Sequence, residues 1–90
     1  MKINILRSAR RTIDAGYWFY ENQEQGLGGY FVDSTMADIR SLSVYAGIHE
    51  AFAYGGYHRM VCSTFPFSVF YKVEGSEVRV YAVLDNRQDP

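Results

Sequence analysis

The chain has 90 residues and a mass of 10.3 kDa, so we expect a single domain over residues 1–90. Hydrophobic residues make up 48% and charged residues 21%, as in a soluble globular domain and unlike a disordered linker. The net charge of −1 excludes a domain-wide basic field for binding nucleic acid. A single cysteine, Cys62, excludes an internal disulfide and a cysteine zinc site, and no other residues have the spacing of a metal site.

The hydropathy of the chain predicts no membrane partner. Its longest apolar run is far shorter than the roughly 20 residues that cross a bilayer. Residues 1–7 are too few and too polar for a secretory signal. We therefore expect a cytoplasmic protein.

The first third of the chain predicts a strand followed by a helix. Residues 2–6 alternate between polar and apolar, as a strand does, and Ser8 stands where a helix N-cap would. From residue 9 to about residue 23 the apolar positions follow a helical period. Gly16 lies on that apolar stripe, which predicts a close approach to another helix.

A second helix is predicted from residue 27 or 28 to residue 45. A glycine-rich turn at residues 25–29 precedes it, and Gly47 is a suitable stop. Two helices joined by so few residues form an antiparallel hairpin.

The remaining residues read as three to four antiparallel strands, at residues 51–54, 57–63, 67–73 and 78–84. The last two strands are joined by a tight two-residue turn at residues 75–76. That turn pairs Val73 with Val78, Tyr71 with Val80 and Val69 with Ala82, all apolar and on one face. The helical hairpin covers this face, so the predicted fold class is α+β.

The opposite face of the sheet carries charge and aromatic rings. The same register places Phe70 opposite Tyr81 and Lys72 opposite Arg79. Like charges in opposite positions are unfavourable. The face is either a solvated surface with one aromatic pair or a basic, aromatic binding surface.

Four segments in order carry a family resemblance: GLGGYF at residues 26–31, YHR at 57–59, FPFSVFYKV at 65–73 and VYAVLDNRQDP at 80–90. Together they resemble the RelE/ParE superfamily of bacterial toxins, the toxin halves of type II toxin–antitoxin pairs, often called plasmid stabilisation proteins. The resemblance covers the whole chain.

The resemblance implies a small growth inhibitor without a cofactor, neutralised by a cognate antitoxin, as a homodimer or a hetero-oligomer with that antitoxin. RelE-like members cut mRNA on the ribosome without a metal. ParE-like members bind and poison DNA gyrase and are not nucleases. A degenerate member that only binds antitoxin is a third alternative. None of these readings implies sequence-specific DNA binding.

For a nuclease, the candidate residues are His58 as general acid or base and Arg59 and Arg87 as phosphate contacts. The resemblance places a functional arginine at Arg87, but the tyrosine that often follows it in RelE-like members is missing. Residues 60–64 also lack the basic side chains of those members. A ribosome binder is expected to carry a large positive excess. The near-neutral charge therefore favours the ParE-like, non-enzymatic alternative.

For a binding protein, the candidate residues are exposed arginine and lysine side chains and exposed aromatic side chains. Arg87 is predicted to be accessible, to lie on the side of Arg79 and Tyr81, and to be held by Asp85 and Asp89. Trp18 projects among polar residues of the first helix, where it either anchors an interface or packs on the sheet edge or against the second helix. The predicted target-binding residues are Phe70, Lys72, Arg79, Tyr81 and Arg87, and the predicted antitoxin-binding residues are Trp18, Phe19, Phe70 and Tyr81.

Overall fold

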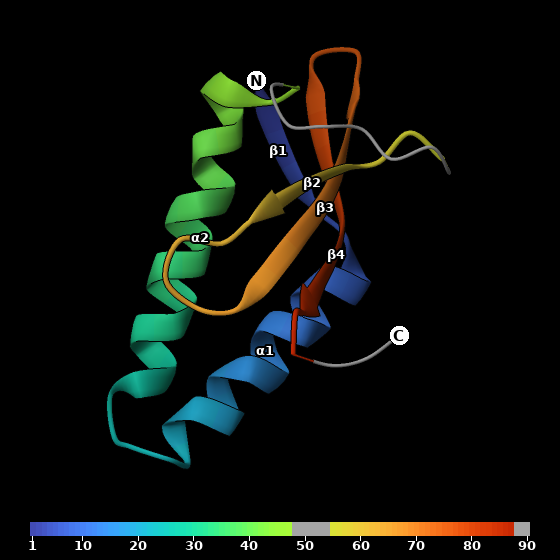
Figure 1. Cartoon of the computed structure of the whole chain (residues 1–90). Helices are drawn as coiled ribbons and strands as arrows, with labels where there is room; N and C mark the ends of the chain where they lie inside the picture. Colours follow the sequence, from blue (N-terminus) through green and yellow to red (C-terminus); the bar gives the residue numbers. More distant parts are fainter. Residues whose placement is uncertain (48–54, 88–90) are drawn as a thin grey trace.

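The computed structural model describes residues 1–47 and 55–87, which form two helices and four strands (Figure 1). The predicted strand at residues 51–54 lies outside the described residues. The elements in chain order are β1 (Lys2–Ile5), α1 (Arg7–Glu21), α2 (Leu27–Tyr45), β2 (His58–Val61), β3 (Phe67–Glu74) and β4 (Glu77–Asp85).

The four strands form one sheet in the order β1-β4-β3-β2. Strands β2, β3 and β4 are antiparallel, whereas β1 joins the edge of β4 in parallel. Both helices lie on one face of the sheet (Figure 1). This arrangement confirms the predicted α+β fold with a helical hairpin on one sheet face. Within residues 1–47 and 55–87, neither helix combines the length and the hydropathy needed to cross a bilayer.

The two helices touch at their glycines. A Cβ atom on Gly16 would lie 2.5 Å from Cε2 of Phe31, which confirms the predicted close approach. A Cβ atom on Gly28 would lie 2.5 Å from the carbonyl oxygen of Tyr17. The Glu21 carboxylate at the end of α1 accepts hydrogen bonds from the amides of Gly26 and Gly28 at 3.0–3.1 Å, so it caps α2. The hairpin is therefore closely packed and cross-capped.

The prediction that Ser8 caps α1 is wrong. The helix begins at Arg7 with Leu6 in the cap position, and no side chain in the described part of the chain caps it. The Ser8 hydroxyl instead donates to the carbonyl of Tyr81 at 2.6 Å. This serine ties the first turn of α1 to β4.

The pairing of β3 with β4 follows the predicted register only in its first half. Val73 opposes Val78 and Tyr71 opposes Val80, as predicted, but Phe70 opposes Ala82 and not Tyr81. Tyr81 is thus an extra residue, a β-bulge. It lies where β1 stops pairing, because Ile5 is the last residue of β1 in register with β4 and the chain then turns into α1.

The bulge reverses the faces of the second half of β4. Val83 is fully buried and opposes Val69, where Ala82 was predicted. Leu84, predicted to face the core, is 52% exposed. The core lies between the helices and the sheet and is formed by apolar residues of the helices and strands. It includes Ile5, Ala9, Ile13, Tyr20, Phe31, Ile39, Leu42, Val69, Tyr71, Val78, Val80 and Val83.

Candidate functional site

Arg87 is held in one pose at the end of β4. Its Nε and Nη2 atoms donate to the two carboxylate oxygens of Asp85 at 3.0 and 2.7 Å. Nη2 also donates to the hydroxyl of Tyr20 on α1 at 3.1 Å. The hydrogen bonds with Asp85 raise the pKa of Arg87 further above its ordinary value, and those from Arg87 lower the pKa of Asp85. The ion pair is therefore charged throughout the physiological range.

The position of Arg87 partly matches the prediction. Its side chain is 51% exposed, and Asp85 orients it, as predicted; Asp89 lies outside the described residues. The prediction that Arg87 lies on the side of Arg79 and Tyr81 is wrong, because the bulge turns the end of β4 toward α1. Tyr20 was not among the predicted site residues, because it has the apolar helical spacing of a core residue.

A cavity of about 420 Å³ lies beside this ion pair, between α1 and the end of β4. Phe19 and Leu84, which are 53% and 52% exposed, both lie beside it, although the register turns the Leu84 side chain to the outer sheet face, opposite Ser68. Exposed apolar side chains beside a cavity are typical of a protein-binding surface. Its walls are formed by Thr12, Ala15, Gly16, Phe19, Phe67, Val83, Leu84 and Asp85.

Trp18 is 62% exposed on α1, next to Phe19. Its ring meets that of Tyr17 edge-on, with 5.0 Å between centroids. Trp18 is therefore accessible to a partner, as its position among polar residues predicted.

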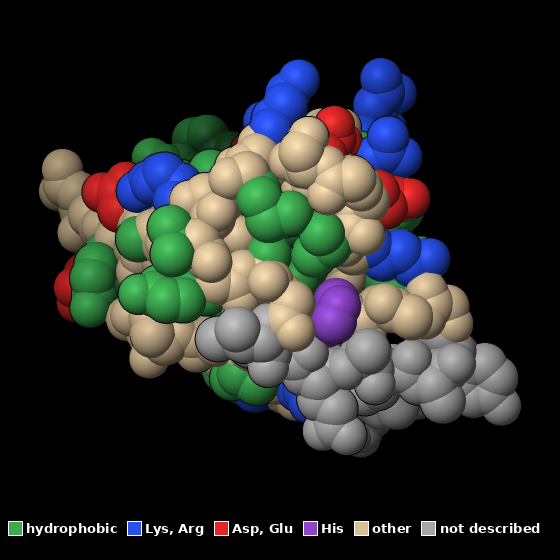
Figure 2. Space-filling view, turned by 90° about the horizontal axis from the view of Figure 1, so that it is seen from above, with side chains coloured by type: hydrophobic (Ala, Val, Ile, Leu, Met, Phe, Trp, Pro, Cys, Tyr) green, Lys and Arg blue, Asp and Glu red, His purple; other side chains and the backbone are tan. Residues whose placement is uncertain are grey.

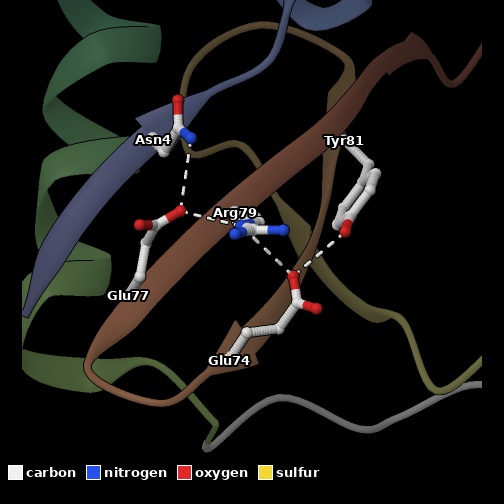
Figure 3. Close-up of polar contacts among 5 residues, drawn as sticks. All are labelled: Asn4, Glu74, Glu77, Arg79 and Tyr81. Carbon is white, nitrogen blue, oxygen red and sulfur yellow. Dashed lines mark hydrogen bonds and ion pairs between the residues drawn. The ribbon is translucent and has the colours of Figure 1, made fainter.

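The outer sheet face, opposite the helices, carries a compensated charge network (Figure 3). Lys72 and Arg79 do lie opposite each other. The Nε atom of Arg79 lies 2.8 Å from Glu77 and 3.4 Å from Glu74, however, and these contacts raise the pKa of Arg79 while Arg79 lowers that of Glu77. The network also includes the hydrogen bonds of Asn4 to Glu77 at 3.2 Å and of Tyr81 to Glu74 at 3.0 Å.

Lys72 has an aromatic environment on the same face. Its Nζ lies 4.5 Å from the centroid of the Tyr57 ring and 5.8 Å from that of Tyr81. The two rings meet edge-on at 5.2 Å. Lys72 therefore avoids the repulsion from Arg79 through cation–π contacts. Phe70 is half-buried and opposes Ala82, so the predicted opposition with Tyr81 is wrong.

The three nuclease candidates lie in different surroundings. His58 is stacked on the buried ring of Tyr71, with 5.1 Å between centroids. Figure 2 shows a face of the molecule on which hydrophobic side chains lie near lysine and arginine side chains. Arg59 is the next residue on β2 and donates to Ser68 at 2.9 Å and Asn86 at 3.2 Å. Arg87 contacts α1. Because neighbouring strand residues point to opposite faces, the structure does not bring His58 and Arg59 together.

The described residues include no group of three or more histidine, cysteine or acidic side chains that would hold a metal ion. Cys62 is buried, and burial with the nearby charge of Asp38 raises the pKa of its thiol to about 12. The thiol is therefore protonated and unreactive at neutral pH.

Comparison with known proteins finds similarity in the three-dimensional structure. Neither the protein-family models nor the curated proteins include a match to this chain. Among solved structures, a chain of the structure described as "Chromosomal ParDE TA system from P. aeruginosa" has a TM-score of 0.84 and 21% identity. The similarity covers 92% of each chain. The protein therefore has the fold of a chain of that ParDE system.

Proposed function

We propose that this protein is the toxin of a type II toxin–antitoxin pair, which inhibits growth by binding DNA gyrase in the cytoplasm and is neutralised by a cognate antitoxin. The shared fold with a chain of a ParDE system, over 92% of both chains, supports this assignment. The motif resemblance to RelE/ParE toxins runs over the same length of sequence.

The charge network of the outer sheet face favours protein binding over RNA cleavage as the activity of this protein. Metal-independent cleavage needs a base, an acid and unpaired cations around one phosphate. Here Arg79 is compensated by Glu74 and Glu77, and His58 is stacked on a core tyrosine. The net charge of −1 also gives no long-range attraction toward the ribosome.

Arg87 and the neighbouring cavity form the proposed contact with gyrase. Of the guanidinium donors, Nε and Nη2 are used inside the chain, and Nη1 has no partner among the described residues. A fixed, half-exposed guanidinium beside apolar side chains suits a partner protein, since it loses little side-chain entropy on binding. The second proposed contact surface lies on the outer sheet face and consists of Phe70, Lys72, Arg79 and Tyr81.

The experiment compares Arg87→Ala with Arg40→Ala, which removes an exposed arginine of α2. We expect Arg87→Ala to reduce growth inhibition and the binding of purified gyrase while the protein stays folded, melting only slightly lower because the contacts of Arg87 with Asp85 and Tyr20 are lost. Arg40→Ala is expected to remain toxic. A fully toxic Arg87→Ala variant would contradict the role of Arg87.

Two assays with wild-type protein separate the alternatives. Incubation with gyrase and plasmid is expected to inhibit supercoiling, and incubation with ribosomes and mRNA is expected to leave the mRNA intact. Cleaved mRNA would instead identify a RelE-like ribonuclease. Antitoxin binding without either effect would identify a degenerate member.

The exposed rings of α1 are the proposed antitoxin contact. Trp18 and Phe19 are large, apolar and more than half exposed, as residues that anchor interfaces often are before binding. Replacement of Trp18 by Ala is expected to weaken antitoxin binding by about 2 kcal/mol, and Tyr45→Ala, a change of an exposed ring on α2, is the control. A loss below about 0.5 kcal/mol for Trp18→Ala would contradict this contact.

A further inference from the structure

The sequence of the second half of β4 is compatible with two registers of pairing with β3. In the observed, bulged register, Val69 opposes Val83 and Tyr81 is the extra residue. Without a bulge, Val69 would oppose Ala82, and every later residue of β4 would change face. Both registers place apolar side chains toward the helices: Val83 in the first, Ala82 and Leu84 in the second.

In the observed register the Leu84 side chain is half exposed, and a cavity lies next to it. Leu84 is 52% exposed although it lines the cavity of about 420 Å³ between α1 and β4. In the same register the Asp85 carboxylate points toward the helices, where the Arg87 guanidinium pairs with its charge. A shift to the second register would move Leu84 toward the cavity and Asp85 toward solvent.

On the side away from β3, few contacts hold this half of β4. Strand β1 pairs only with Glu77–Val80, so β3 is the only described strand that pairs with the residues beyond the bulge. The observed register is held by two contacts with α1: the 2.6 Å hydrogen bond of Ser8 to the Tyr81 carbonyl and the 3.1 Å hydrogen bond of Arg87 to Tyr20. The burial of Val83 and the hydrogen bond from the Asn86 amide to the Pro66 carbonyl at 2.8 Å add to these. The Asn86 side-chain oxygen also accepts hydrogen bonds from Ser68 at 2.7 Å and from Arg59 at 3.2 Å.

We infer that the end of β4 is a two-state element that exchanges between the bulged register and a regular one. The exchange carries Arg87 from the α1 side, beside Tyr20, to the outer sheet face, the face that also carries Arg79. A partner that binds Arg87 in one register then selects that register. This consequence rests on the proposed function, in which Arg87 contacts a partner; the register exchange itself does not.

The exchange is tested by nuclear magnetic resonance on the isolated protein. In wild type, relaxation dispersion and saturation transfer are expected to show a minor state, of roughly 0.1–10%, confined to residues 67–70 and 81–87. Ser8→Ala removes one hydrogen bond from the bulged register and is expected to raise the minor population about fivefold. Ser34→Ala, whose hydroxyl donates within α2, is the matched control and is expected to have no effect.

Two further variants fix the two registers. Deletion of Tyr81 makes the observed pairing of Val69 with Val83 regular, so it is expected to abolish the exchange. The double variant Ala82→Val/Val83→Thr favours the second register, and its Val69 Hα is expected to show a nuclear Overhauser contact with residue 82 in place of residue 83. This static readout does not depend on the rate of exchange.

Exchange that persists after deletion of Tyr81 would overturn the inference. It would also be overturned if the double variant kept the contact of Val69 with residue 83, or if that variant failed to fold and neither wild type nor Ser8→Ala showed exchange. Growth assays of Arg87→Ala report on the proposed function, so each idea fails by its own measurement.

Discussion

Two adjacent glycines at the start of α2 are expected to respond in opposite ways to the same substitution. In Gly28→Ala the new Cβ atom would lie 2.5 Å from the Tyr17 carbonyl oxygen and 2.9 Å from Cβ of Glu21. In Gly29→Ala it would meet no atom of residues 1–47 and 55–87 within 4 Å. Both residues lie in α2 without a positive φ, so alanine fits the backbone at either position.

The expected magnitudes follow from these contacts. Replacing a helical glycine by alanine stabilises by up to about 1 kcal/mol, which is the whole effect at Gly29. At Gly28 the clash is with backbone, which cannot rotate away as a side chain can, and overpacking of this kind costs about 1–3 kcal/mol or more. The helices must separate, which also loosens the contact between Gly16 and Phe31. We expect a net loss of about 2 kcal/mol in the free energy of unfolding for Gly28→Ala.

The assay is thermal and urea unfolding of the two variants beside wild type. For a domain of this size 1 kcal/mol corresponds to roughly 4–8 °C, so Gly28→Ala is expected to melt roughly 8–16 °C lower and Gly29→Ala a few degrees higher. If both variants shifted in the same direction, or if Gly28→Ala equalled wild type, the close helix contact would not be the reason for the glycine.

Three other predictions concern single polar groups. Thr35→Val is expected to raise the stability by about 1 kcal/mol in urea unfolding, because the buried Thr35 hydroxyl has no hydrogen-bond partner among the described residues and such groups cost about 1–3 kcal/mol; a loss of stability would contradict this. Cys62 is expected to resist iodoacetamide at pH 8 until urea unfolds the protein, because its pKa is raised to about 12; labelling of the folded protein would contradict this. Because the pKa of Asp85 is lowered by Arg87, its ion pair stabilises the fold above about pH 4, the unfolded value, and that contribution is lost as the pH falls through the lower, folded pKa. Asp85→Asn is therefore expected to reduce stability at pH 7 and to flatten its acid dependence, whereas an unchanged acid profile would contradict the assignment.

Much of the fold follows from local patterns in the sequence. The helical hairpin was predictable because the apolar residues keep a helical period on both sides of a glycine-rich turn, and Gly16 on that stripe predicted the contact with Phe31. The tight turn at residues 75–76 and the alternation beside it gave the pairing of Tyr71 with Val80. These features depend on residues close together in the chain.

The candidate site depended on contacts between distant segments, so only part of it was predictable. Asp85 orients Arg87 because the two are neighbours in sequence, and this was foreseen. The bulge at Tyr81 was not, because it forms where β1 leaves the sheet and Ser8 binds a carbonyl of β4, 73 residues away. One extra residue reverses the faces of a strand, so only the tertiary structure decided that Arg87 lies against Tyr20 and not on the sheet face of Arg79.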